Sequence, residues 1–411
     1  MSQISPSPNG DPSPRDFSRG PGTGHKRPPR PITLSDLTED LLWPRLFRVV
    51  PLALRPDRLG IALFTGLICA LLLRAMRSAA GPEVWDRLGP GLTFRINEGL
   101  ARAAEGSFGG LLASLESWFT GTWWPMWRDH PLSITGCLVG LAAAIGIGGG
   151  AIARACAVEF SHGAVSPWTR VLAFSFARGV ALTSALISPL IVAGVICAGL
   201  ALGGWVLLNW PGVNVLGAVL YGLFLLAGLV AVLLLFGFAL GGWMVVPAVV
   251  CEGTDAIDGL QRMYAYVIGR PLRLLLYMAI GLAQVMLGVA VFGTIAWWCV
   301  RLTGASAGAL VGEPAAEILG ELGVGPTPET SGTWTAAAHV LKFWAAIPAA
   351  IVGAFAFSGV ISTSTVVYLL MRRLVDGQDE AELWMPGMVE GTTALSTSGA
   401  TTAEDEDDGE D

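Results

Sequence analysis

Charged residues are scarce in this chain of 411 residues: they make up 14% of it, whereas hydrophobic residues make up 53%. A soluble globular domain usually carries about 25% charged residues. A chain with so few charges cannot cover a water-facing surface with polar groups. The scarcity argues against a soluble enzyme or binding domain and predicts an integral membrane protein.

Several other features are missing. Only Lys26 and Lys342 are lysine, and no basic face carries interleaved aromatic residues, so we expect no nucleic-acid partner. The six cysteines lie in or beside apolar runs without a C-x-x-C pair, which argues against disulfides and a zinc site. We expect no metal and no cofactor. The first ~40 residues hold no apolar stretch, so a cleavable signal peptide is not expected.

Long uncharged apolar runs recur along the chain, and a helix needs about 20 such residues to cross the hydrocarbon core of a bilayer. The runs predict an all-α membrane protein, a bundle of about six transmembrane helices with short amphipathic interfacial helices and disordered tails. The fourth run stays uncharged to Val250, which predicts one tilted helix followed by an irregular segment at Gly241, Gly242 and Pro247. The predicted spans are residues 59–74, 132–153, 180–208, 215–240, 272–300 and 343–371.

The membrane domain is expected over residues 35–375. Residues 1–34 are rich in Pro, Ser, Gly and Arg and are predicted to be a disordered tail, as is the acidic segment 376–411. Within the domain, residues 75–131 are predicted to lie on the outer surface of the membrane, because tryptophan prefers the boundary between water and lipid. The tryptophans of this segment are Trp85, Trp118, Trp123, Trp124 and Trp127.

The distribution of arginine predicts the orientation. Basic residues gather before the first span, in the second-to-third and fourth-to-fifth connections, and after the sixth span. The fifth-to-sixth connection instead carries Glu313, Glu317, Glu321 and Glu329. The positive-inside rule therefore places both termini in the cytoplasm, with the chain in the cytoplasmic (inner) membrane of a bacterium. The expected partners are the lipid bilayer and other membrane proteins.

The two connections on the predicted cytoplasmic side follow the same order: a span, a glutamate, a short amphipathic helix, an arginine and a span. This order suggests an internal duplication. An unpaired carboxylate at the end of an apolar run is costly, so Glu159 is expected to pair with Arg170 or Arg178, and Glu252 with Arg262 or Arg270. The candidate polar cluster consists of Glu159, Arg170, Glu252, Asp255, Asp258, Arg262 and Arg270. These residues either clamp the short helices to the bundle or form a functional polar site.

Helix signals place the second short helix from an N-cap at Thr254 through Ile268, with Gly269 at its C-terminal cap. The glycine run at 146–150 lacks the Lys-Ser/Thr of a phosphate loop, so we interpret it as helix packing. The sixth span carries hydroxyl side chains that either pack against neighbouring helices or line a pathway. They are Ser358, Ser362, Thr363, Ser364 and Thr365.

The stretch from Trp243 to Asp255 follows the pattern W-x3-P-x4-E-G-T-D, and residues 52–59 read Leu-Ala-Leu-Arg-Pro-Asp-Arg-Leu. Together with Arg262, Tyr264, Tyr266 and Arg270-Pro271, these features resemble an uncharacterised family of bacterial polytopic membrane proteins over about residues 35–375. The resemblance implies a membrane fold and no assigned activity.

The function hypotheses follow from what the spans carry. Near mid-bilayer they hold no Asp, Glu, Lys or Arg, and no catalytic triad spacing is evident, which favours a non-enzymatic scaffold or accessory subunit of membrane machinery. The alternative is a transporter or channel for small or apolar solutes, based on the paired units and the sixth-span hydroxyls. A further alternative is a lipid-processing enzyme, with carboxylates of the candidate cluster as general acid and base.

Overall fold

The computed structural model describes residues 43–81, 124–313, 315–320 and 332–385, together with positions 101 and 113. The predictions for residues 1–34, for 82–123 apart from those two positions, and for 386–411 lie outside this part. Every element bounded within it is a helix. The elements are η1 (Trp43–Arg48), α2 (Val49–Ala53), α3 (Pro56–Ala80), α6 (Trp124–Asp129), α7 (Pro131–His162), α8 (Trp168–Ala177), α9 (Gly179–Leu208), α10 (Val213–Gly241), η3 (Gly242–Met244), α11 (Val245–Glu252), α12 (Ala256–Gly269), α13 (Pro271–Gly308), α14 (Ala315–Gly320) and α15 (Thr333–Val375).

Six helical stretches of the described part are long and apolar enough to cross a membrane. They are α3, α7, α9, the stretch Val213–Glu252, α13 and α15. The protein is therefore an all-α membrane bundle that contacts lipid along these helices, as the apolar runs predicted. Some helices extend beyond the predicted spans: α7 continues to His162 and α15 begins at Thr333. The apolar runs mark only the part inside hydrocarbon, whereas a helix continues wherever its backbone hydrogen bonds are satisfied.

The fourth span changes its helix type where the sequence predicted an irregular segment. Helix α10 ends at Gly241, and the 3-10 turn η3 connects it to α11. Pro247 lies inside the first turn of α11 rather than in an irregular segment. A proline is tolerated there because the first N–H groups of a helix have no acceptor within it.

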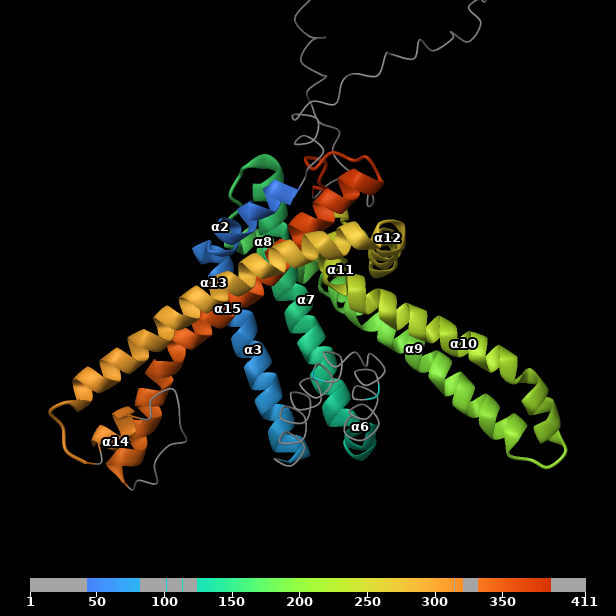
Figure 1. The fold of residues 1–411 in the computed structure, drawn as a ribbon, viewed down its shortest axis with the longest axis horizontal. Coiled ribbons are helices and arrows are strands. Elements are labelled where there is room, and N and C mark those ends of the chain that lie inside the picture. Colours follow the sequence, from blue (N-terminus) through green and yellow to red (C-terminus); the bar gives the residue numbers. More distant parts are fainter. Residues whose placement is uncertain are drawn as a thin grey trace, which may run out of the picture. The chain divides into compact units, whose positions relative to one another are not determined.

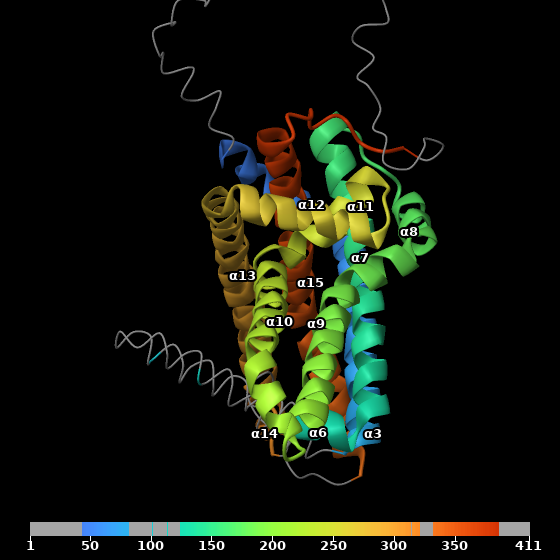
Figure 2. The same ribbon diagram turned by 90° about the vertical axis from the view of Figure 1, so that its right-hand side faces the viewer.

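The spanning helices associate in pairs. Helix α3 packs along α7, α9 along α10, and α13 along α15, as Figures 1 and 2 both show. Helix α15 also contacts α3 and α7, and α7 contacts α9. The short helices α8, α11 and α12 lie against the ends of these spans.

The buried core lies at one end of the spans, where α7, α11 and α15 meet. Residues 146–160 of α7 are mostly buried, all of α11 is buried, and so is α15 from Ser358 to Arg372 except at Val360. A Cβ atom at Gly148 would overlap the side chain of Thr65 on α3, so a larger residue would push the two helices apart. The interpretation of the glycine run as helix packing is confirmed.

The described chain does not end with α15. Residues 376–385, which we call the C-terminal strap, fold back onto the core, and Leu383 and Trp384 are buried. The sequence placed the beginning of a disordered acidic tail at residue 376. The strap differs from that prediction because its apolar residues find a surface on α11 and α8 that the sequence does not reveal.

Candidate functional site

Glu252, the last residue of α11, is completely buried and surrounded by polar side chains from two other helices. The Tyr368 hydroxyl donates to its Oε1 at 2.9 Å, and Arg372 Nη1 donates to the same oxygen at 3.0 Å. Arg262 Nη1 of α12 lies 3.5 Å from Oε2. We call these four residues the Glu252 cluster. The predicted pairing of Glu252 with Arg262 is confirmed, whereas Arg270 is the exposed C-cap residue of α12.

The negative charge around Arg262 favours its charged form. Burial alone would lower the pKa of Arg262, but Glu252, Tyr368, Tyr266 and Asp376 together outweigh burial and raise this pKa above its ordinary value. Tyr266 of α12 donates its hydroxyl to Asp376 Oδ2 at 2.5 Å, beside the cluster. Its burial, together with Asp376, raises the pKa of Tyr266, so the phenol stays protonated and remains a donor.

The second carboxylate, Glu159 on α7, is partly buried and does not pair as predicted. Its Oε1 accepts from Arg55 at 2.5 and 3.0 Å, and its Oε2 accepts from Arg58 Nη2 at 2.5 Å. The prediction of Arg170 or Arg178 as its partner was wrong. It considered only residues that follow Glu159 in the chain, whereas α3 begins beside the end of α7 and brings both arginines to it.

Arg170 and Arg178 have other surroundings. Arg170 is exposed on α8. Arg178 donates to the carbonyl oxygen of Thr254 at 3.5 Å, and its guanidinium lies 5.0 Å from the ring centre of Trp384. It therefore connects the start of α9 to the connection after α11 and to the strap.

The two aspartates of the candidate cluster lie at the start of α12. Asp255 is the N-cap of this helix, because its side chain accepts from the backbone N–H groups of Ile257 and Asp258 at 3.0 Å each. The sequence predicted Thr254 for this role, one residue too early. Asp258 is exposed in the first turn, where a negative charge is favourable. Neither Gly269, the last residue of α12, nor Arg270 has the left-handed conformation typical of a helix cap.

The C-terminal strap covers the cluster. The backbone N–H of Trp384 donates to the Cys251 carbonyl at 2.9 Å, and Arg372 Nη2 donates to the Asp379 carbonyl at 2.8 Å. Gly253 has a φ of 61° and lies directly under the Trp384 ring, so a larger residue fits neither the backbone nor the space. Glu380 pairs with Arg45 and with Arg373.

The sequence did not identify Tyr368, Arg372 or the strap as part of this site. Tyr368 and Arg372 are four residues apart near the end of the last span, on one face of α15, which is the signal that could have pointed to them. The connections after α7 and after α11 also resemble each other in the structure, as their sequences suggested. Both α7 and α11 end at a left-handed glycine, Gly163 and Gly253, but Glu159 precedes its glycine by one helical turn and Glu252 precedes its glycine directly. The internal duplication stays a prediction.

Each of the two carboxylates is paired with two arginines. The Oε2 atom of Glu252 is buried and accepts no hydrogen bond from the described part of the chain, and its ion-pair partner Arg262 lies 3.5 Å away. Within the described ranges, no three His, Cys, Asp or Glu side chains gather in a way that could hold a metal ion. The six cysteines lie in this part as free thiols.

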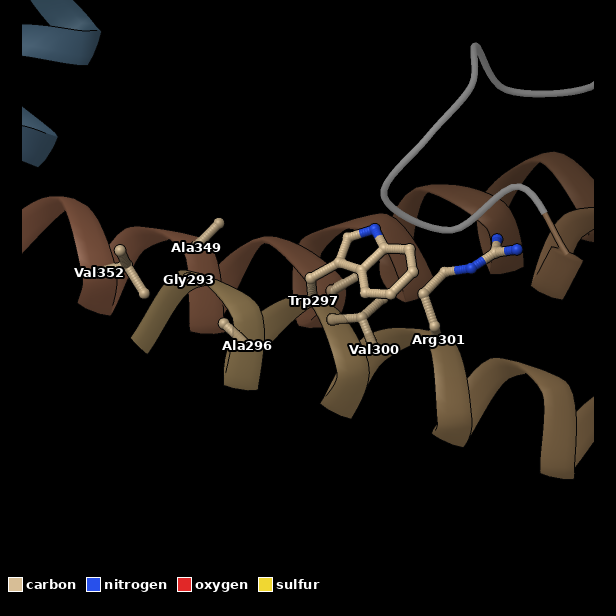
Figure 3. A pocket seen from close by; sticks show the side chains of 8 residues that line it. Gly293, Ala296, Trp297, Val300, Arg301, Ala349 and Val352 are labelled. Carbon is tan, nitrogen blue, oxygen red and sulfur yellow. The ribbon is translucent and has the colours of Figure 1, made fainter. Parts of the chain in front are cut away.

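The sixth-span hydroxyls lie in packed contacts and are fully shielded from solvent. Ser358 donates to the Ala53 carbonyl at 3.0 Å, and Ser364 and Thr365 donate back to carbonyls of their own helix. Cavities lie elsewhere. One of about 230 Å³ separates α13 from α15 between Gly293 and Arg301, and Figure 3 shows Trp297 beside it. None of the five hydroxyl-bearing residues of the sixth span lines this cavity.

Comparisons with known proteins yielded no relative. No model of a known family matches the chain, no curated protein matches it, and no solved structure matches it. The resemblance of residues 243–255 to a bacterial membrane family therefore stays a prediction.

Proposed function

We propose that this integral membrane protein is a non-enzymatic scaffold or accessory subunit that binds another membrane protein through the pair α9 and α10. The observation that carries the proposal is the complete burial of the Glu252 carboxylate among its paired side chains. A carboxylate that is enclosed and bound by two arginines and a tyrosine fixes the positions of α11, α12 and α15. The carboxylate exposes no surface that a substrate could reach, which disfavours the lipid-processing alternative.

The surface available to a partner lies on α9 and α10. Over the most apolar 18 residues of each span, 17% of the residues are buried in α9 and 11% in the stretch Val213–Glu252. The corresponding shares in the other four spans are 22–44%. Val195, Gly199 and Leu202 follow helical spacing on one face of α9 and are exposed. A Cβ at Gly199 would meet no atom within 4 Å. Small residues on such a face allow a helix of another protein to approach closely in lipid, where packing rather than the hydrophobic effect holds helices together.

The distribution of arginine along the chain supports an orientation with both termini on the same side of the membrane. We place the scaffold in the cytoplasmic membrane of a bacterium, with both termini in the cytoplasm. The Glu252 cluster and the strap then lie at the cytoplasmic end of the bundle. The transporter alternative loses its main support, because the hydroxyls of α15 are enclosed.

A photo-crosslinking amino acid at Val195 is expected to yield one defined protein adduct in membranes of the native host. Gly199→Leu is expected to abolish that adduct while the melting temperature stays unchanged, because its side chain enters open space on the same face. Gly203→Leu is the matched control, since its Cβ would lie 2.8 Å from Phe224 and disturb the pair itself. Adducts with lipid alone, or a partner-free protein with transport or hydrolytic activity, would contradict the scaffold proposal.

A further inference from the structure

A groove between α3, α7 and α8 has the dimensions of a lipid site. It encloses about 520 Å³ and is lined on α3 from Pro56 to Ile68, on α7 around Ile147, and on α8 by Trp168, Leu172 and Phe176. Pro56 to Ile68 corresponds to about 18 Å of helix. One leaflet of the hydrocarbon core is about 15 Å thick, half of the full core. The groove is therefore as long as one leaflet is deep.

The walls of the groove suit a hydrocarbon chain. Its lining is apolar except at one end, and the hydroxyl of Thr65 is satisfied by the Ile61 carbonyl at 2.8 Å. The adjacent Gly148 leaves room for the Thr65 side chain, so α3 and α7 pack closely where they line the groove. No buried polar group at Thr65 therefore opposes an acyl chain in the groove.

The groove is continuous with the surface that contacts lipid. Phe64 on α3 and Trp168 and Phe176 on α8 line it and are 59%, 57% and 63% exposed. Phe64 belongs to a membrane-spanning helix. The mouth of the groove is therefore beside the hydrocarbon of the bilayer, which favours a lipid chain as its occupant.

The charged end of the groove defines the head group. Asp57, in the first turn of α3, lines the groove where the span begins. The arginines on either side of it in the chain, Arg55 and Arg58, are bound to Glu159. The Asp57 carboxylate thus offers its charge to a cation, and an ammonium at the level of the head groups is complementary to it.

We propose that this groove binds one phospholipid with an ammonium-bearing head group, its acyl chain along α3 and its ammonium at Asp57. The site is independent of the α9–α10 surface proposed above. It lies between three elements that the core holds together, so a bound lipid would fill the space between α8 and the pair α3 and α7.

The test uses the full chain reconstituted with equimolar phosphatidylethanolamine and phosphatidylglycerol of identical acyl chains, followed by native mass spectrometry of the released protein. The wild type is expected to retain one phosphatidylethanolamine. Gly60→Trp is expected to lose this lipid, because Gly60 lines the groove and its Cβ would meet no atom within 4 Å. Gly136→Trp on α7, equally open but outside the groove, is expected to keep it.

The variant Asp57→Asn distinguishes recognition of the lipid head group from binding of the acyl chain. This variant is expected to retain one lipid but to lose its preference for phosphatidylethanolamine. If Gly60→Trp melts early, Gly60→Leu serves in its place, since it fills less of the groove. Retention of the lipid by both Gly60 variants, or an unchanged preference in Asp57→Asn, would overturn the proposal.

Discussion

Replacing Arg372 by methionine is expected to lower the free energy of unfolding by about 3–5 kcal/mol, the usual cost of breaking a buried ion pair. Arg372 is completely buried and pairs with an equally buried Glu252. Without it, the Glu252 carboxylate keeps Tyr368 and the more distant Arg262 as partners, which leaves a buried charge poorly compensated. The variant also loses the bond to the Asp379 carbonyl, which holds the strap.

The neighbouring residue is the matched control for this experiment. Arg373 pairs with Glu380 at 3.1 Å, but 44% of its side chain is exposed. Because exposed pairs contribute little, Arg373→Met is expected to cost less than about 1 kcal/mol. The double variant Glu252→Gln with Arg372→Met removes both charges and should recover part of the loss. Equal destabilisation by the two arginine variants, measured by denaturation in detergent micelles, would refute the assigned role of the cluster.

The second large effect is expected at Gly148, where α7 packs closely against Thr65 of α3. In Gly148→Ala the new methyl group would occupy the place of the Thr65 hydroxyl, so one helix has to shift. Overpacking of this kind typically costs about 1–3 kcal/mol. Gly136→Ala on the same helix meets open space and should be neutral or slightly stabilising, because alanine favours helix more than glycine does.

A second-site change distinguishes a clash from a general intolerance of larger residues. Thr65→Ala removes the hydroxyl that would collide with the new methyl group, and this hydroxyl donates to the Ile61 carbonyl of its own helix. The double variant Thr65→Ala with Gly148→Ala is therefore expected to be more stable than Gly148→Ala alone. If Thr65→Ala brings no recovery, the close approach of α3 and α7 at this point is wrong.

Most of the fold could be predicted from the sequence, because lipid makes long uncharged runs into helices irrespective of their neighbours. The break after Gly241 was visible for a similar reason, since paired glycines weaken a helix locally. The pairing of Glu252 with Arg262 could also be predicted, because Arg262 lies in the helix that directly follows Glu252 in the chain.

The remainder of the candidate site could not be predicted, because it depends on which helices meet. Arg55 and Arg58 reach Glu159 across about a hundred positions of the chain, and Arg372 reaches Glu252 across a similar distance. Hydropathy describes each helix by itself and contains no information on its neighbours. The strap was missed because Leu383 and Trp384 are a short apolar signal within a segment of polar and acidic residues.

We interpret the Glu252 cluster as an enclosed structural contact and not as an open site. The most direct test is the reactivity of the adjacent Cys251, which is completely buried. Folded protein in detergent is treated with N-ethylmaleimide, and adducts are mapped by peptide mass spectrometry, with denatured protein as the positive control. We expect Cys251 to remain unmodified until the protein unfolds. Modification of Cys251 in the folded protein at the rate of the denatured chain would contradict this interpretation.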